Sequence, residues 1–220
     1  MANIGKFLVI DGTDGSGKAT QTKLLISRIK EEGLPVETIS FPQHGQRSAG
    51  PVDEYLEGLY GDPTKIDAKI GSTFYAVDRF AARAKMRGWL ESGSNVVADR
   101  YVSANMGHQG SKIDDPQKRM EFFRWNDGLE YGLFGIPWPD LTVILHVPAE
   151  VSMELIKKRG NKTDGHETLQ HLKNAEATYI EMPKLFPNMV LIECFRDGRL
   201  LSPAEIHALV WQIVQPLLAA

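Results

Sequence analysis

Residues Phe7 to Lys18 read FLVIDGTDGSGK, an apolar stretch that runs directly into a glycine-rich segment ending in a lysine. Four consecutive apolar residues predict a buried strand, and the glycines predict a turn before a helix. Backbone N–H groups can close around phosphate oxygens only where side chains are absent and positive φ is tolerated. A lysine at the end of such a turn supplies a mobile cation for β- and γ-phosphates. The segment is therefore predicted to bind nucleotide phosphates.

One observation supports the assignment of this phosphate-binding loop, and another departs from the usual pattern. The apolar residues after it fall near helical spacing, which disfavours the alternative of a glycine turn that binds nothing; they are Leu24, Leu25, Ile29 and Leu34. The full pattern requires Ser or Thr directly after the lysine, where a hydroxyl ligates Mg²⁺. Here that residue is Ala19, and the hydroxyl is displaced by one position to Thr20.

Length and composition restrict the class of protein. A chain of 220 residues is long enough for one sizeable α/β domain, and we expect a single domain over 1–220. A net charge of -3 and a pI near 6.1 exclude a broad basic surface for nucleic acid. No apolar run approaches membrane-spanning length, and the single cysteine, Cys194, cannot pair within the chain. These features favour the cytoplasm, small anionic partners, and a packed rather than reactive Cys194.

The order of elements indicates an α/β protein with a parallel sheet covered by helices on both faces. Strands are predicted at Phe7–Ile10, Val36–Ser40, Asn95–Ala98, Leu141–Val147 and Met189–Cys194. A long helix is predicted over Thr64–Glu91, because this stretch lacks proline and ends at Ser92-Gly93-Ser94. A final packing helix is predicted over Pro203–Leu218, with Ser202 as its N-cap.

Charged residues follow the third predicted strand. Asp99 and Arg100 end that strand, and ligands of open α/β sheets bind beyond the carboxyl ends of the strands. The pair is therefore expected to face the same crevice as the phosphate-binding loop. There Asp99 can hold Mg²⁺ directly or through water, and Arg100 can donate two hydrogen bonds to one phosphate. The alternative is a surface ion pair. Asp78 and Arg79 offer a second guanidinium, although such a pair within a helix also suits a solvated face.

A basic segment lies late in the chain, where Lys157, Lys158, Arg159 and Lys162 fall within six residues, with Gly160 among them and Gly165 shortly after. This composition suits a mobile lid over phosphates, at about 158–167. The alternative is a favourable interaction of cations with a helix C-terminus. Phe41-Pro42 follows the second strand, where an aromatic ring can stack on a base or simply pack.

Together these motifs resemble the thymidylate kinases, a branch of the nucleoside monophosphate kinases with the P-loop fold. The resemblance covers nearly the whole chain. It rests on the loop at Asp11 to Gln21, Phe41-Pro42, Asp78-Arg79, Asp99-Arg100-Tyr101, Gly107-His108-Gln109-Gly110, and Lys158-Arg159-Gly160 through Gly165-His166-Glu167. It implies a three-layer P-loop kinase fold with a five-stranded parallel sheet and a short basic lid.

The resemblance also implies roles for individual residues. ATP is held by the loop residues Gly12, Thr13, Asp14, Gly15, Ser16, Gly17, Lys18, Ala19 and Thr20. The acceptor is bound by Asp14 near its sugar, Phe41 and Tyr75 at its base, Arg79 and Arg100 at its phosphate, and Gln109 near the base edge. The catalytic set is Lys18, Asp14, Arg100 and the lid arginine Arg159.

Four positions depart from the family pattern. Ala19 lacks the metal-binding hydroxyl, so metal binding would depend on Asp99, ATP oxygens and water. His44 stands where many members have arginine, which leaves Arg47 as a substitute. Ser103 appears one residue earlier than the family serine and is followed by Ala104 and Asn105, which leaves the base contacts open. Gly15 replaces an arginine of some members, so a catalytic cation would come from the lid.

The function predicted from these features is the ATP- and Mg²⁺-dependent phosphorylation of dTMP to dTDP. Two alternatives remain at this point, a kinase of another nucleotide or deoxynucleoside on the same fold and a catalytically impaired nucleotide-binding module. The expected partners are ATP, dTMP and a second copy of the chain, without nucleic acid or membrane. Tyr75, Phe80, Met86 and Trp89 of the long helix suit either a dimer face or the core.

Overall fold

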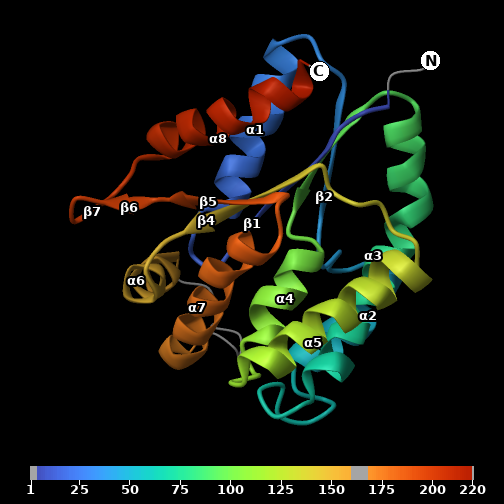
Figure 1. Ribbon diagram of the computed structural model, residues 1–220, viewed down its shortest axis with the longest axis vertical. Coiled ribbons are helices and arrows are strands. Elements are labelled where there is room, and N and C mark those ends of the chain that lie inside the picture. The colour runs from blue at the N-terminus through green and yellow to red at the C-terminus, as the bar shows by residue number, and fades with distance from the viewer. Residues whose placement is uncertain (1–3, 160–167, 220) are drawn as a thin grey trace.

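A five-stranded parallel sheet forms the centre of the molecule, with strand order β2-β3-β1-β4-β5 (Figure 1). The computed structural model describes residues 4–159 and 168–219, except for the side chain of Arg159. The strands are β1 Phe7–Gly12, β2 Val36–Ser40, β3 Asn95–Asp99, β4 Leu141–His146 and β5 Met189–Glu193. Each overlaps its predicted range, so the prediction of a five-stranded parallel sheet is confirmed.

Helices cover both faces of this sheet. Successive side chains of a strand point to opposite sides, and in β1 Phe7 and Val9 join one buried cluster while Leu8 and Ile10 join another. The first cluster contains side chains from α3 (Ala68–Glu91), α4 (Val102–Gly110), α5 (Pro116–Asp127) and α7 (Leu169–Leu185). The second contains side chains from α1 (Lys18–Glu31) and α8 (Pro203–Leu218). The predicted three-layer architecture is thus confirmed.

Capping side chains determine where the two predicted helices begin. The α3 helix starts four residues later than predicted, because Asp67 caps it by accepting from the Lys69 N–H at 2.8 Å. The Thr64 N–H instead donates to Asp62 in a preceding turn. The α8 helix starts as predicted, because Ser202 accepts from the Glu205 N–H and Glu205 accepts from the Ser202 N–H.

The remaining elements are short. They are a 3₁₀ turn at Arg47–Ala49 (η1), α2 (Gly50–Leu56), a π-helical turn at Gly128–Leu133 (η2), α6 (Ala149–Arg159), and the hairpin of β6 (Phe195–Arg196) and β7 (Arg199–Leu200). The hairpin was not predicted, because strands of two residues carry no readable alternation. Its turn, Asp197-Gly198, has positive φ at both positions and was the available signal.

Two expectations from composition concern Cys194 and membrane insertion. Cys194 is fully buried in the second cluster, and burial raises the pKa of its thiol to about 12, which confirms a packed rather than reactive side chain. Among the described residues, no helix is both long and apolar enough to cross a membrane.

Candidate active site

The phosphate-binding loop joins β1 to α1 and is shaped by three glycines. Gly12, Gly15 and Gly17 have φ values of +138°, +85° and +91°, which residues with side chains rarely adopt. A Cβ atom on Gly12 would lie 2.4 Å from the Leu145 carbonyl oxygen, and one on Gly15 would lie 2.8 Å from that of Ser152. The loop therefore requires glycine for conformation, as the sequence predicted, and for space at Gly12 and Gly15.

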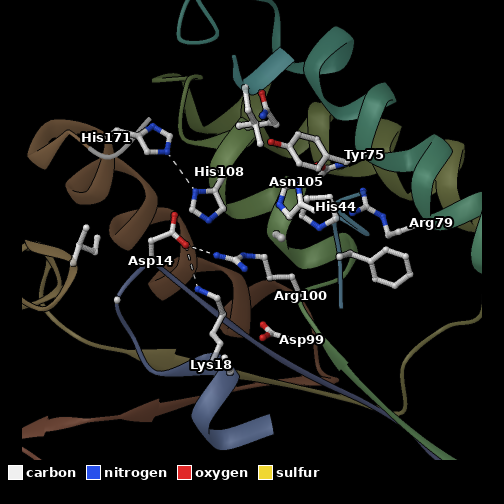
Figure 2. Close-up of a pocket in the computed structure, with 18 of the residues that line it drawn as sticks. Asp14, Lys18, His44, Tyr75, Arg79, Asp99, Arg100, Asn105, His108 and His171 are labelled. Carbon is white, nitrogen blue, oxygen red and sulfur yellow. Dashed lines mark hydrogen bonds and ion pairs between the residues drawn. The ribbon is translucent and has the colours of Figure 1, made fainter. Parts of the chain in front are cut away.

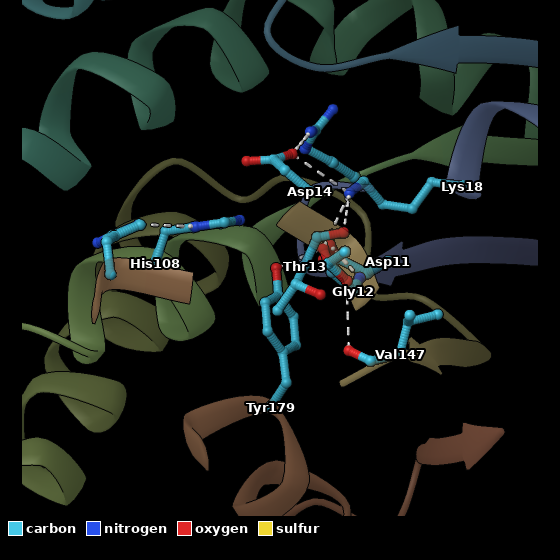
Figure 3. Close-up of polar contacts among 11 residues, drawn as sticks. Asp11, Gly12, Thr13, Asp14, Lys18, His108, Val147 and Tyr179 are labelled. Atoms are coloured by element: carbon cyan, nitrogen blue, oxygen red, sulfur yellow. Dashed lines mark hydrogen bonds and ion pairs between the residues drawn. The ribbon is translucent and has the colours of Figure 1, made fainter. Parts of the chain in front are cut away.

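The Lys18 ammonium folds back over this loop. Its Nζ donates to the carbonyl oxygens of Gly12 at 3.0 Å and Thr13 at 2.8 Å, and it lies 3.5 Å from an Asp14 oxygen (Figure 3). Burial and the nearby positive charge of Arg100 lower the pKa of Lys18 to about 8, although Asp14 acts in the opposite direction. The lysine is thus held beside the loop as a partly desolvated cation.

Asp14 and Arg100 form an ion pair at the centre of the site (Figure 2). Burial alone would raise the pKa of Asp14, but Arg100 and Lys18 outweigh it and hold that pKa well below its usual range. Arg100 has a positive φ of 64°, and its N–H donates to the Ile10 carbonyl of β1 at 3.0 Å. This left-handed residue turns the chain at the end of β3, beside the phosphate-binding loop, as expected from the sheet topology.

A cavity of about 290 Å³ opens between the loop and the helices α3 and α4. Figure 2 shows side chains from the loop, from the end of β3 and from both helices pointing into it. Eleven of the predicted site residues line it: Asp14, Gly15, Gly17, Lys18, Ala19, Phe41, Tyr75, Arg79, Asp99, Arg100 and Gln109. Residues from distant parts of the chain are thus brought to one cavity.

The side of the cavity formed by α3 and α4, here called the α3–α4 wall, consists of Tyr75, Arg79, Ala104, Asn105, His108 and Gln109. Arg79 is 1% exposed and donates two hydrogen bonds to the Glu130 carboxylate of η2, from Nε to Oε2 at 2.5 Å and from Nη2 to Oε1 at 2.7 Å. Burial would lower the pKa of Arg79, but Glu130 raises it. Arg79 is therefore fixed in orientation by a partner that sequence reasoning missed.

Asp78 is also buried, so the alternative of a solvated helix face for Asp78 and Arg79 is wrong. Its carboxylate accepts from the Gln43 N–H at 2.7 Å and the Ser48 hydroxyl at 2.6 Å. These bonds hold the segment that follows Phe41, whose ring is 1% exposed and whose bond to Pro42 is cis. Asp78 thus supports the place of Phe41 in the cavity.

The same segment carries the two candidates for the missing family arginine. His44 lines the cavity, and its Nδ1 lies 2.5 Å from Asp53 Oδ1 of α2. Arg47 is exposed and does not line the cavity. Of the two, the structure brings only His44 to the site.

Two amide side chains of α4, Asn105 and Gln109, are held in the α3–α4 wall by buried hydrogen bonds. The Asn105 Nδ2 donates to Ser72 O at 3.1 Å, Glu130 Oε1 at 3.2 Å and Asn126 Oδ1 at 3.4 Å. Gln109 Nε2 donates to the Tyr55 hydroxyl at 3.3 Å. The sequence leaves the role of Asn105 open, because its buried partners lie 21 to 33 residues away and local spacing does not reveal them.

Two histidines at the edge of the cavity were also missed. His108 Nδ1 and His171 Nε2 lie 3.3 Å apart, and the two ring planes differ by 15°. Burial lowers the pKa of both rings, that of His108 to about 3. They are therefore neutral near pH 7, with one ring donating to the other. The motif Gly107-His108-Gln109-Gly110 marked this segment but not its contact with α7.

Asp99 was predicted to hold Mg²⁺, and its surroundings fit that role. Its Oδ1 is buried and has no hydrogen-bond partner among the described residues, although it borders the cavity beside Lys18 and Arg100. Carboxylate oxygens are preferred Mg²⁺ ligands, and Mg²⁺ usually takes one or two of them together with phosphate oxygens and water. Within the described part of the chain no cluster of three His, Cys, Asp or Glu side chains suits a metal. A site that depends on Asp99 and a bound phosphate is consistent with both observations.

The other side of the phosphate-binding loop borders a second cavity of about 160 Å³. It is lined by Gly15, Ser16, Gly17 and Thr20 of the loop and α1, and by apolar residues of α6, β7 and α8 that include Leu155, Leu200 and Ile206. Ser16 and Thr20, two predicted nucleotide contacts, thus face this cavity. Thr13 is buried, and its hydroxyl has no partner among the described residues.

The predicted lid lies almost entirely outside the described residues. Arg159 ends α6, but its side chain and residues 160–167 are not among those described. The catalytic role of Arg159 therefore stays a prediction.

Comparison of the sequence with known proteins matches one family model and several relatives of the same description. The sequence model of the thymidylate kinase family matches residues 10–196. The thymidylate kinase of Mycobacterium tuberculosis is 29% identical over 170 residues, which cover 77% of this chain and 78% of that protein. A probable thymidylate kinase of Pyrococcus horikoshii is 27% identical over 212 residues, which cover 96% of each chain.

A solved structure shares the fold. The thymidylate kinase of Candida albicans superposes with a TM-score of 0.77, covering 97% of this chain and 92% of that one, at 18% sequence identity. The parallel sheet and its flanking helices therefore have a known counterpart over nearly their full extent.

Proposed function

The chain belongs to the thymidylate kinase family, and on that premise we propose that it transfers the γ-phosphoryl group of ATP to dTMP, giving ADP and dTDP. One observation supports this most directly. A single cavity has the phosphate-binding loop with Lys18 and Arg100 on one side, and a wall of aromatic and amide side chains on the other. The first side suits two sets of phosphates, and the second suits a base.

In the proposed reaction an ionised oxygen of the acceptor phosphate attacks the γ-phosphorus, and the bond from that phosphorus to the β–γ bridging oxygen breaks. No general base is required, so the protein contributes positioning and charge neutralisation. Lys18 and the loop N–H groups bind the ATP phosphates, and Arg100 binds the acceptor phosphate. Asp14 orients Arg100 and lies near the acceptor sugar.

Mg²⁺ would be held by Asp99, directly or through water, and when bound it supplies charge neutralisation across the β- and γ-phosphates. Ala19 has no side-chain oxygen to contribute. Arg159 is the proposed lid cation. This is supported by the backbone of Ser152, which lies so close to Gly15 that no arginine fits at that loop position.

The proposed base contacts follow from the fixed orientation of Asn105. Its Nδ2 is used by three buried acceptors, so its Oδ1 remains for a ligand, and no described residue donates to that oxygen. Thymine carries an N3–H donor that fits such an acceptor, whereas cytosine presents a bare nitrogen at that position. Phe41 and Tyr75 flank the base and Gln109 lies near its edge, while Arg79 joins Arg100 at the acceptor phosphate. A buried polar group that recognises a donor strongly rejects a base lacking it.

We also propose a homodimer through α3. Its exposed side includes Ile70, Val77 and Phe80, which are 55%, 41% and 44% exposed, and the small residues Ala81 and Ala84. These positions recur at the spacing of one helix face, and small residues allow two helices to approach closely. Met86 is fully buried in the core and Tyr75 lines the cavity, so they do not belong to this face. Sedimentation or light scattering of Val77→Glu tests the proposal, with a monomer as the expected result.

The function is tested by an ADP-coupled assay with a panel of acceptors. We expect dTMP to be preferred over dUMP, CMP and GMP. A purine monophosphate or a free nucleoside as best acceptor would contradict the proposal, although the fold would stand. ATP binding without acceptor-dependent turnover would instead indicate an inactive nucleotide-binding module.

A further inference from the structure

The carboxylate of Asp11 lies fully buried at the end of β1, immediately before the phosphate-binding loop. Three donors surround it. The Gly12 N–H and the Tyr179 hydroxyl donate to Oδ1 at 2.8 and 2.9 Å (Figure 3). The Ser103 hydroxyl donates to Oδ2. Burial raises the pKa of Asp11, while Ser103 and Lys18 act in the opposite direction. A carboxylate without solvent depends on such donors to stay ionised and in one orientation.

The two hydroxyl donors come from different helices. Tyr179 lies on α7 and Ser103 on α4, 168 and 92 residues away from Asp11 in sequence. Space for the Tyr179 ring is provided by Gly107 of α4, where a Cβ atom would lie 2.4 Å from the ring carbons. The close approach of α4 and α7 therefore brings both hydroxyls to one carboxylate.

The orientation of Asp11 bears on Lys18 through the intervening backbone. Asp11 holds the N–H of Gly12, and the carbonyl oxygens of Gly12 and Thr13 hold the Lys18 ammonium. Gly12 has a φ of 138° and no side chain to restrict its backbone. The hydrogen bond from its N–H to Asp11 therefore adds a restraint to the one that pairing with Leu145 of β4 provides.

We propose that Tyr179 and Ser103 are positioning residues for phosphoryl transfer, acting through the buried carboxylate of Asp11 on the phosphate-binding loop and Lys18. This rests on the proposed function but concerns residues that line neither cavity. Transition-state stabilisation depends on charges held in place before the reaction, so a loosened loop lowers kcat more than it weakens ground-state binding. We assign neither residue a contact with a substrate.

Tyr179→Phe removes one hydroxyl and keeps the ring that fills the space beside Gly107. We expect kcat to fall about tenfold while KM for ATP and for dTMP changes less than about twofold. Ser103→Ala is expected to do the same. Because both hydroxyls hold one carboxylate, their effects should be coupled. The fold-loss of kcat in the double variant should therefore differ from the product of the two single fold-losses.

The matched control is Thr178→Val, which removes a buried hydroxyl from the adjacent residue of α7. Among the described residues that hydroxyl donates to the Asn174 carbonyl of the same helix and to no other group, so kcat should stay within about twofold. Thermal unfolding of all variants separates stability from turnover. Unchanged kcat in Tyr179→Phe, or a loss matched by Thr178→Val, would overturn the proposal and leave a structural role only. Failure of the wild-type chain to phosphorylate any nucleotide would instead contradict the proposed function.

Discussion

The phosphate-binding loop and the α3–α4 wall form two sides of one cavity but are built in opposite ways. The loop is continuous in sequence, and Lys18 finds its backbone acceptors at Gly12 and Thr13, at most six residues away. The wall depends on contacts between distant segments. Arg79 is fixed by Glu130, 51 residues away, and Asn105 by Ser72, 33 residues away.

This difference separates two kinds of specificity. Phosphate is the same group in every nucleotide, so a local backbone motif with one cation suffices to bind it. A base is distinguished by a few donors and acceptors, which must be held rigidly by buried partners. Changes in the loop should therefore affect turnover, whereas changes behind the wall should affect stability and acceptor choice.

The largest expected effect on stability comes from breaking the buried ion pair behind the wall. Glu130→Ala leaves the Arg79 guanidinium buried without its partner, and such losses destabilise by about 3–5 kcal/mol. The control is Glu181→Ala, because Glu181 pairs with Arg119 at 2.9 Å nearer the surface, where a pair contributes about 1 kcal/mol or less. Denaturant unfolding measures both. Equal losses would show that Arg79 is not held by Glu130 as described.

The largest expected effect on turnover comes from the loop. Lys18→Met should lower kcat roughly a hundred- to thousandfold, about 2.7–4 kcal/mol, because it removes a cation directed at the β- and γ-phosphates. The control is Lys112→Met, since burial lowers the pKa of Lys112, like that of Lys18, to about 8, yet Lys112 does not line the cavity. Its loss should reduce stability and leave kcat nearly unchanged. Near-normal turnover of Lys18→Met would contradict the kinase assignment.

The same contrast explains what the sequence could predict. Alternating apolar strands and the glycine pattern identified the sheet, its layers and the loop, because these signals are local. Asp99 and Arg100 were placed correctly in the crevice because the carboxyl ends of parallel strands share one edge. The start of α3 was predicted too early because Asp67 caps the helix while Thr64 belongs to a turn.

The rest depended on pairings that no local pattern contains. Glu130 sits in an irregular π-helical turn, and nothing near it marks it as the partner of Arg79. Ser103 was considered only in relation to base contacts, but it bonds Asp11. Tyr179 has the ordinary spacing of a core residue in α7, so its hydroxyl bond to Asp11 could be found only in three dimensions.

A smaller effect is expected from the two arginines of the site, and turnover and unfolding measured on the same variants distinguish the two regions. Arg79→Ala and Arg100→Ala should each lower kcat/KM for dTMP more than tenfold and affect ATP binding less, since a charge-assisted hydrogen bond contributes roughly 1.5–3 kcal/mol. Only Arg79→Ala should also lower the free energy of unfolding strongly, because Glu130 is then buried with the Asn105 amide but without a cation. An equal loss of stability in Arg100→Ala would remove the distinction between loop side and wall.

The smallest expected effect is a pH dependence that belongs to the loop side alone. Burial and the charge of Arg100 lower the pKa of Lys18 to about 8, so the free enzyme loses this proton as the pH rises through 8. We therefore expect kcat/KM for ATP to fall above pH 8, to about a tenth by pH 9. The pH above which kcat falls should be higher than the pH above which kcat/KM falls, because bound phosphates favour the ammonium form of Lys18. Arg100→Gln should raise the pH at which kcat/KM for ATP falls, because it removes a positive charge near Lys18. Glu130→Gln, behind the wall, should leave that pH unchanged. A limb that lies near pH 10 in the unmodified enzyme would show that Lys18 is not the desolvated cation described.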